Sequence, residues 1–222
     1  MAIRVHHLNK SRSQRIVWLL EELGLDYQVK RYERDLRTRL APPELRAVHP
    51  LGKSPVIQDG DVTVAETGAV VEYLLETYGN GRLRPAPGTE AARRFTYWLH
   101  YAEGSAMPPL LLKLVFGLLP SRAPGLVKPI VRQIAAKAQT GFIDPQLRAH
   151  VGYWEDELAR HPWFAGDEFT AADIMMSFPV EAGADRAFDV ADQPRLKDFL
   201  ERIHARPAYR RALERGGDYT YA

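Results

Sequence analysis

Residues 49–68 constrain the fold more than any other part of the chain. Their Asp59-Gly60 pair separates two short apolar runs, at residues 56–57 and 62–64. Asp-Gly tolerates the positive φ angles that a tight hairpin turn needs, so the two runs are predicted to pair as antiparallel strands. Pro55 then enters the first strand at its first position, because a proline inside a central strand removes a hydrogen-bond donor. The stretch therefore predicts a loop, a hairpin and a helix start, in that order.

The end of this hairpin carries groups suited to an extended ligand. Glu66 and Thr67 open a run of apolar residues with helical spacing that stops at Gly79. Thr67 is expected in the first turn, where free backbone N–H groups and the helix dipole favour a carboxylate. Glu66 suits an ammonium group, and Lys53 in the entry loop suits a second carboxylate. A helix cap and a solvated lysine are the simpler readings of each residue alone, but the ordered set predicts a binding site.

The first 80 residues alternate between strand and helix patterns. Residues 2–8 and 27–31 alternate as strands, whereas residues 16–23 and 42–48 have helical patterns. A helix that connects the first two strands makes them parallel, while the hairpin is antiparallel. We therefore expect residues 1–80 to form an α/β domain with a mixed four-stranded sheet of the thioredoxin-like kind.

The second part of the chain has no strand pattern. Residues 81–89 are rich in glycine and proline and predict a linker. Residues 90–119 are helical in pattern, and Met107-Pro108-Pro109 is expected to kink or break that helix. A loop is expected at residues 120–124, with a helix over 127–140 and another beginning at Asp144-Pro145. Residues 90–222 are thus predicted to form an all-helical domain, in which Thr170 and Asp173 give a capping-box pattern.

Composition excludes several classes of protein. The chain has no cysteine, which excludes disulfide scaffolds, thiolate metal sites and a catalytic cysteine. Its 30 basic and 28 acidic residues are intermixed, so a net charge of +2 does not indicate a nucleic-acid surface. The longest apolar run, residues 110–119, is shorter than a bilayer span, and we expect a cytoplasmic protein without membrane insertion. His6 and His7 are neighbours on one strand and would point to opposite faces, so no metal site is expected.

These motifs resemble the glutathione S-transferase family over nearly the whole chain. The likeness rests on the loop at residues 50–56, the Glu66-Thr67 pair and the helix start at residues 170–173. Residues 6–13 and 174–179 make it most similar to the fungal and bacterial Gtt-like branch. The resemblance implies glutathione as co-substrate, and it implies a homodimer, with Glu103 as a candidate to reach the partner's site.

The family's binding residues are carried over by position. Ser54 would pair its backbone with the cysteinyl part of glutathione, beside a cis Pro55. Lys53 would hold the glycyl carboxylate, and Glu66 with Thr67 would hold the γ-glutamyl end. No metal is implied.

The family's chemistry requires the glutathione sulfur as thiolate. A free cysteine thiol has a pKa of about 8.5, and lowering it by two units takes about 2.7 kcal/mol, most of which one charge-assisted hydrogen bond can supply. Ser11 is the first candidate donor, and the start of the first helix would assist it. Ser13 is the second, because it can instead cap the helix, as Ser11 also can. Asn9 and His7 are further candidates, and the family's catalytic tyrosine has no counterpart in this turn.

The resulting hypothesis is a glutathione transferase of detoxification, whose bound thiolate attacks a small hydrophobic electrophile held between the domains. Two alternatives stay open: a glutathione-dependent peroxidase or disulfide reductase, and a glutathione-binding or ligand-binding protein without catalysis. Turnover through a protein thiol is excluded, because the chain has no cysteine. The candidates for the electrophile pocket come from the kinked helix and the capped helix, and they are Tyr101, Met107, Leu111, Phe116 and Phe178.

Overall fold

The structure is a computed structural model that describes residues 2–35, 37–38 and 40–221. Its sheet has the strand order β2-β1-β3-β4. β1 (Ile3–Leu8) pairs in parallel with β2 (Tyr27–Tyr32) and antiparallel with β3 (Val56–Asp59), which pairs antiparallel with β4 (Val62–Ala65). The mixed four-stranded sheet expected from the sequence is confirmed, and Asp59 and Val62 pair across the predicted turn.

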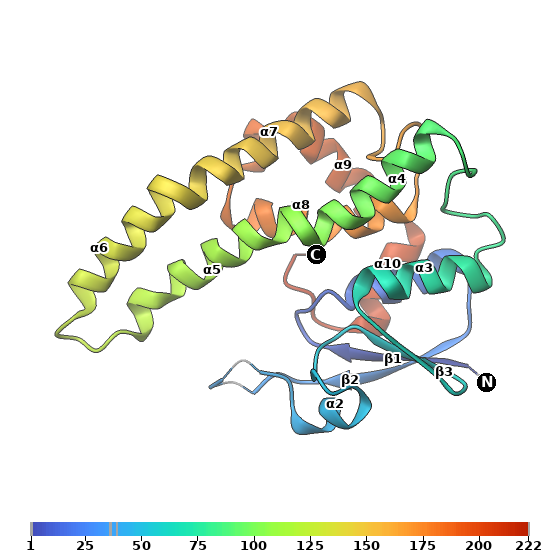
Figure 1. The fold of residues 1–222 in the computed structure, drawn as a ribbon, viewed down its shortest axis with the longest axis horizontal. Coiled ribbons are helices and arrows are strands. Elements are labelled where there is room, and N and C mark those ends of the chain that lie inside the picture. The colour runs from blue at the N-terminus through green and yellow to red at the C-terminus, as the bar shows by residue number, and fades with distance from the viewer. Residues whose placement is uncertain (1, 36, 39, 222) are drawn as a thin grey trace.

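Helices cover both faces of this sheet (Figure 1). α1 (Gln14–Leu23) and α3 (Thr67–Tyr78) share one core with β1 and β3 and separate the sheet from the helical half of the chain. α2 (Pro43–Val48) lies on the opposite side, where its Leu45 packs with Leu8 and Tyr32. The C-terminal end of β1 and the start of α1 thus meet at the boundary between the two halves.

The helical half is built around a buried helix, α8 (Ala171–Arg186). The predicted capping box at its start is present. Thr170 accepts from the Ala172 N–H at 3.2 Å, and the Thr170 N–H donates to the Asp173 carboxylate at 2.8 Å. The same carboxylate accepts from the Phe164 N–H at 2.9 Å, so this buried side chain also fixes the preceding loop.

Two long bent helices pack beside α8 and extend beyond the body of the molecule (Figure 1). The first runs through α4 (Glu90–Tyr101), the π-helical turn η1 (Ala102–Ala106) and α5 (Met107–Arg122). The distortion predicted near Pro108 and Pro109 is this π turn, which directly precedes the two residues whose missing N–H donors interrupt regular helical bonding. α5 continues through Pro120, so the loop expected at residues 120–124 begins later than predicted.

The second long helix returns along the first. It comprises α6 (Lys128–Ala138), the π turn η2 (Gln139–Ile143) and α7 (Asp144–Arg160). α7 begins at Asp144, as predicted, but the expected gap before it is absent, because η2 joins α6 to α7 without a break. α9 (Pro194–His204), preceded by the 3-10 turn η3 (Val190–Asp192), completes this layer.

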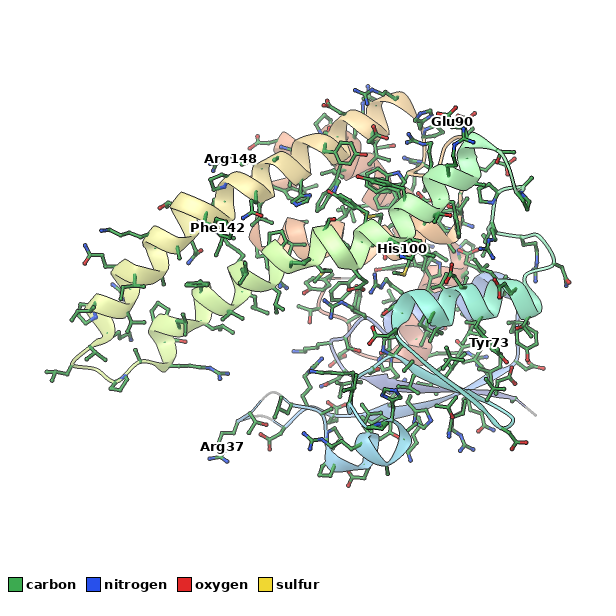
Figure 2. The ribbon with its side chains drawn as sticks, in the orientation of Figure 1. Arg37, Tyr73, Glu90, His100, Phe142 and Arg148 are labelled. Carbon is green, nitrogen blue, oxygen red and sulfur yellow. The ribbon has the colours of Figure 1, made fainter. Side chains whose placement is uncertain are left out.

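Residues 107–143, here called the arm, present an unusual surface (Figure 2). Residues 104–143 contain five cations and no Asp or Glu. One helical stretch of the described residues, Glu90–Arg122, has the length and hydropathy to cross a membrane, and 28% of its most apolar window is buried. The arm therefore leaves a large apolar surface uncovered in the single chain. Its exposed apolar side chains are Leu111, Leu114, Val115, Leu118, Leu119, Leu126, Val127, Ile130, Ile134 and Phe142.

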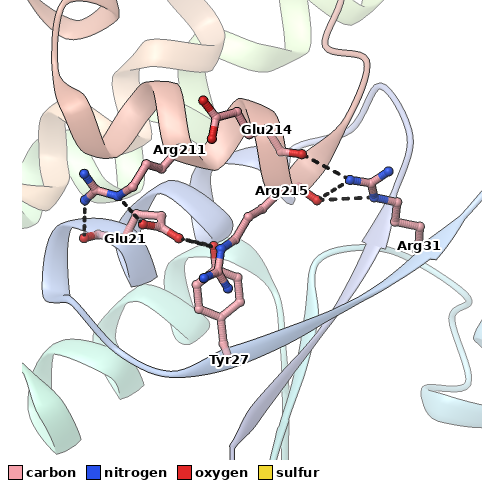
Figure 3. A network of polar contacts seen from close by, with 6 residues as sticks. All are labelled: Glu21, Tyr27, Arg31, Arg211, Glu214 and Arg215. Carbon is pink, nitrogen blue, oxygen red and sulfur yellow. Dashed lines mark hydrogen bonds and ion pairs between the residues drawn. The ribbon is translucent and has the colours of Figure 1, made fainter.

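The last helix, α10 (Pro207–Gly216), returns to the sheet domain (Figure 3). Glu21 of α1 accepts from Arg211 at 2.6 Å and from the Tyr27 hydroxyl at 2.6 Å, and it pairs with Arg215 at 3.1 Å. Arg31 of β2 donates to the Arg215 carbonyl at 2.6 Å. These contacts fasten the C-terminal helix to α1 and β2, so the two halves are joined at both ends of the helical part.

We expect Asp173→Ala to lower the free energy of unfolding by about 2 to 4 kcal/mol, because it removes a helix cap and leaves two buried N–H groups without an acceptor. Thr89→Ala is the matched control, since it removes an exposed N-cap on α4 and should cost about 1 kcal/mol. Urea unfolding of both variants checks this. Equal losses in the two would contradict the role given to Asp173.

Candidate active site

Two adjoining cavities lie where β1, α1 and the hairpin meet the helical half. One, of about 340 Å³, is lined by Ser11 together with Leu111 and Phe178. The other, of about 190 Å³, is lined by Glu66 and Thr67. The structure thus brings together residues that are far apart in the sequence. The residues common to both linings are Arg12, Leu51, Lys53 and Ser54.

The hairpin entry loop is tied to β1. The Ser54 hydroxyl donates to the His6 carbonyl at 2.8 Å and accepts from the Leu8 N–H at 3.2 Å. The Ser54–Pro55 peptide bond is cis, as the resemblance implied. Lys53 beside it is exposed and has no hydrogen-bond partner among the described residues. This cation is therefore available to a ligand carboxylate.

Glu66 and Thr67 occupy the start of α3. Glu66 has φ +72° and ψ +128°, a conformation that side-chain-bearing residues rarely adopt and that occurs most often at functional sites. Its carboxylate is exposed at the smaller cavity, whereas Thr67 is buried in the first helical turn. The arrangement places a carboxylate and the free N–H groups of a helix start side by side.

Ser11, Ser13 and His7 form a buried hydrogen-bonded row. The Ser11 and Ser13 hydroxyls lie 2.8 Å apart, and the Ser13 Oγ lies 2.9 Å from His7 Nδ1. Ser13 occupies the N-cap position of α1 but makes no capping hydrogen bond with its side chain. Ser11 instead accepts from the Ser13 N–H at 3.3 Å. Burial, and secondarily the charge of Arg31, lowers the pKa of His7 to about 4, so this imidazole is neutral near pH 7.

Asn9 faces the loop after β2. Its amide donates to Glu33 and its side-chain oxygen accepts from the Arg34 N–H at 3.1 Å. Arg34 in turn donates from Nε to the Asn9 carbonyl at 3.3 Å. The Asn9 side chain is thereby engaged in holding residues 33–34 against the end of β1.

An ionic cluster centred on the buried Arg15 connects the site to the helical half. Arg15 of α1 donates to the Met175 carbonyl at 2.7 Å and pairs with Glu103 of η1, which also pairs with Arg12 at 3.0 Å. Both guanidinium groups lie over the Phe178 ring, at 5.6 Å from Arg12 and 5.3 Å from Arg15. Although burial opposes it, the two arginines hold the pKa of Glu103 below its ordinary value. Glu103, expected at the partner's site, thus pairs within its own chain.

Sequence reasoning missed this cluster. The sequence signal for it was Arg15, which adjoins Ile16 and Val17 on the apolar stretch of the first helix. A guanidinium is rarely buried without a partner, so this position indicates an ion pair. Arg15 is 1% exposed.

The five residues expected in the electrophile pocket have different surroundings. Leu111 and Phe178 line the larger cavity beside Ser11. Tyr101 lies in an aromatic cluster between α4 and α7, where its hydroxyl accepts from Trp154 Nε1 at 3.0 Å and contacts His150. Met107 is buried at the start of α5 and Phe116 is half-buried farther along it. Among the described residues, the latter three line neither cavity.

The C-terminal tail packs behind the larger cavity. Tyr221 meets the Phe178 ring edge-on with 5.6 Å between centroids, and its hydroxyl accepts from Arg186. Tyr219 donates to the buried Glu181 of α8, which also accepts from Tyr209 at 2.7 Å. The tail therefore fixes the Phe178 wall from its far side.

Comparison with known proteins places this site in a family. The glutathione S-transferase N-terminal domain matches residues 3–76, and the glutathione S-transferase C-terminal domain matches residues 118–207. Glutathione S-transferase 3 of Schizosaccharomyces pombe is 35% identical over 219 residues, which cover 98% of this chain and 89% of that protein. Glutathione S-transferase 1 of Saccharomyces cerevisiae is 31% identical and covers 96% of this chain and 94% of its own length.

A solved structure agrees with these relatives. The crystal structure of a glutathione S-transferase from Actinobacillus pleuropneumoniae superimposes with a TM-score of 0.75 at 37% identity, covering 96% of this chain and 92% of that one. The chain therefore belongs to the glutathione S-transferase family. Its activity is that of a glutathione transferase, and the likeness to fungal and bacterial members seen in the sequence is confirmed.

Replacing His7 should change how folding stability depends on pH. Because its folded-state pKa of about 4 lies below the usual value of 6.5, the unfolded chain binds the proton more readily between these pH values. Stability contributed by neutral His7 is present above about pH 6.5 and is lost as the pH falls through 4. We expect the stability difference between wild type and His7→Gln to shrink by about 3 kcal/mol over this window.

Urea unfolding at several pH values measures this difference. Burial raises the pKa of Asp173 to about 6, so Asp173 favours the folded state increasingly as the pH falls, which is opposite to the effect of His7. This effect of Asp173 is the same in wild type and in His7→Gln, so it cancels in the difference. A pH-independent difference would contradict the buried neutral state of His7.

Proposed function

We propose that this glutathione transferase binds glutathione across the two cavities and stabilises its thiolate through the Ser11 hydroxyl. The observation that carries the proposal is the row of hydrogen bonds from His7 through Ser13 to Ser11. In the arrangement that we propose, His7 Nδ1–H donates to Ser13, Ser13 donates to Ser11, and the Ser11 O–H is left to donate to sulfur. Each donation strengthens the next, which favours the thiolate over the thiol.

The remaining contacts to glutathione follow from the cavity linings. Glu66 would bind the ammonium group and the first turn of α3 at Thr67 the carboxylate of the γ-glutamyl end. The Ser54 backbone, beside Pro55, would pair with the cysteinyl part, and Lys53 would bind the glycyl carboxylate. This order supports a sulfur position at the junction of the two cavities, next to Ser11. Asn9 is a weaker candidate for contact with sulfur, because its amide is engaged with the loop after β2.

The electrophile would occupy the larger cavity against Leu111 and Phe178. Thiolate attack forms a bond between sulfur and the electrophilic atom, and the leaving group departs with its electron pair. Tyr101, Met107 and Phe116 are weaker candidates for contact with the electrophile, because they are absent from the described linings of both cavities. We assign residues 1–80 to glutathione binding, residues 81–89 to the linker and residues 90–222 to acceptor binding. A cytoplasmic detoxification role accords with this chemistry, and a peroxide or disulfide acceptor would use the same thiolate.

Ultraviolet difference titration of bound glutathione tests the thiolate assignment. We expect a bound-thiol pKa well below that of free glutathione, and Ser11→Ala should raise it by about one to two units, because one charge-assisted hydrogen bond is lost. Ser13→Ala should raise it less, since Ser13 positions the donor. Ser121→Ala is the matched control, because this serine lies on the exposed arm.

Two results would contradict the assignment. A depressed pKa that Ser11→Ala leaves unchanged would transfer the role to Ser13, Asn9 or the helix start. Glutathione binding without any depression would favour a binding protein without catalysis.

We also propose that the protein is a homodimer in which the arm contacts a second copy. The support is the exposed apolar side chains that the described part of the arm carries on two neighbouring helices, because a contiguous apolar patch often marks a protein–protein interface. An isologous interface would bury this surface on both copies at once.

Analytical ultracentrifugation checks the oligomeric state. Wild type should sediment at twice the chain mass of 25.1 kDa, and the double variant Leu118→Arg/Ile130→Arg should sediment as a monomer, because buried cations without partners oppose association. Glu201→Arg, an exposed charge change on α9, is the control and should remain a dimer. A monomeric wild type would refute the proposal.

A further inference from the structure

The Phe178 ring of α8 lines the larger cavity and is held in place by contacts on its other sides. It is 7% exposed, so protein surrounds nearly all of it. The guanidinium groups of Arg12 and Arg15 lie 5.6 and 5.3 Å from the ring centroid. Tyr221, from the C-terminal tail, meets the ring edge-on with 5.6 Å between centroids. The position of this part of the lining therefore depends on Tyr221, which is not itself among the described residues of the lining.

The Tyr221 ring is supported in turn by its own neighbours. The Tyr221 hydroxyl accepts a hydrogen bond from Arg186 of α8, whose guanidinium also lies 5.7 Å from the ring centroid. The Tyr219 ring meets the Tyr221 ring edge-on, with 5.4 Å between centroids. Edge-to-face aromatic pairs and cations near ring faces both favour one ring position over others. Tyr221 is thus a fixed support behind Phe178.

Tyr219 fastens the tail, residues 217–221, to the core of the helical half. Its hydroxyl donates to the carboxylate of Glu181, which is 3% exposed and lies about one turn after Phe178 on α8. The same carboxylate accepts from the Tyr209 hydroxyl at 2.7 Å and from His204 Nε2 at 3.0 Å. A buried carboxylate needs such donors, because hydrogen bonds replace the water that it has lost. The tail and Phe178 are therefore held on neighbouring turns of one helix.

The start of the tail is also constrained. Gly216, the last residue of α10, packs so closely against Gln14 that an added Cβ atom would come within 2.2 Å of Gln14 Oε1. Gly217 follows with φ +84°, in the region that favours glycine. Gln14 is the first residue of α1 and directly follows Ser13. The path of the tail is therefore set next to the helix start that carries the proposed thiol donors.

The larger cavity is small enough for the position of Phe178 to matter. Its volume is about 340 Å³, which is near the lower end of the range for small-molecule sites, and glutathione would occupy part of it. Protein interiors are close-packed, so a ring that is supported from behind does not move back without a cost in free energy. Removing the support leaves a space into which the ring can move. The tail therefore affects how large an acceptor fits.

We propose that Tyr221 sets the size limit of the acceptor by holding the Phe178 ring in position. The inference rests on the proposed function, because it takes the larger cavity as the acceptor site. Tyr221 is a positioning residue, since it contacts Phe178 and not the acceptor. Acceptors with a single ring fit against Phe178 in the wild type, whereas acceptors with fused rings require this ring to move back.

Two acceptors of different size test the proposal. 1-Chloro-2,4-dinitrobenzene and 1-chloro-2,4-dinitronaphthalene both react with the glutathione thiolate by forming a carbon–sulfur bond and releasing chloride, and the second has a fused ring. At saturating glutathione, kcat/KM for each is divided by its uncatalysed rate constant with glutathione. We expect Tyr221→Ala to raise the normalised naphthalene-to-benzene ratio by about fivefold or more, because relief of overpacking is worth at least that much.

Three further variants show whether the Tyr221 ring is responsible. Tyr221→Phe keeps the ring and loses only the Arg186 hydrogen bond, so its ratio should stay close to that of wild type. Tyr221→Leu has a smaller side chain and should raise the ratio less than Tyr221→Ala, and it takes the place of Tyr221→Ala if that variant does not fold. Tyr73→Ala is the matched control, because this half-buried tyrosine on α3 bonds to Asp59 at 2.9 Å and is not in the described lining of either cavity. It should lower the Tm and leave the ratio unchanged.

Each outcome supports or overturns the inference. A ratio that the smaller side chains at position 221 leave unchanged overturns it while leaving the transferase assignment intact. An equal rise in Tyr73→Ala or in Tyr221→Phe also overturns it, because general loosening or the lost hydrogen bond would then be the cause. Equal losses for both acceptors, with weaker glutathione binding by calorimetry, overturn it as well. Turnover of neither acceptor by wild type, with no depressed pKa of the bound thiol, overturns the proposed function and this inference with it.

Discussion

The buried charge of Arg15 is the constraint on which the arrangement of the site depends. A guanidinium that is 1% exposed has exchanged its water for protein partners, and an unpaired charge at that depth would be strongly destabilising. Its partners come from two other elements, the Met175 carbonyl of α8 and the Glu103 carboxylate of η1. α1, α8 and the bent helix must therefore meet at one point. That point lies beneath Phe178, so the Arg15–Glu103 ion pair supports this wall of the larger cavity.

Contacts between distant residues also hold the part of the site where we propose that the thiol binds. Ser11 precedes α1, which Arg15 anchors, and Ser13 is held by His7 on β1 at 2.9 Å. The entry loop is held in turn by the Ser54 hydroxyl, which bonds to the backbone of β1. The groups proposed to surround the sulfur thus stand on a strand and a helix start, and hydrogen bonds hold their side chains in place. Support of this kind is what a preorganised site requires.

Much of this could be predicted from the sequence, for reasons that are local. The Asp59-Gly60 turn, the capping box at Thr170 and the alternation of β1 and β2 are encoded within a few residues, and the structure has all of them. The residues proposed to bind glutathione could be recognised as a set, because the hairpin orders them along the chain. The strand directions also followed from local patterns, because a helical crossover makes the first pair parallel and a tight turn makes the second antiparallel.

The remainder depends on contacts between distant residues. The pairing of Arg15 with Glu103 spans 88 positions, and no periodic pattern records it. Tyr101 was placed at the pocket by its position on the kinked helix, whereas its hydroxyl faces Trp154 of α7. The prolines at 108 and 109 predicted a distortion of the helix but not its form. A missing backbone N–H donor can be accommodated by a break in the helix or by a wider turn.

The π turn η1 sets the register of everything beyond it. Each residue of an α-helix advances by about 100°, so one extra residue in a turn rotates the following side chains relative to those before it. Glu103 points to the arginines, while the apolar faces of α5 point away along the arm. A single-residue deletion between 102 and 106 would restore regular α-helical bonding. It would also rotate the apolar faces of α5 relative to the helix before the turn. In this segment substitutions are therefore better tolerated than changes in length, and related chains should keep its residue count even where its composition drifts.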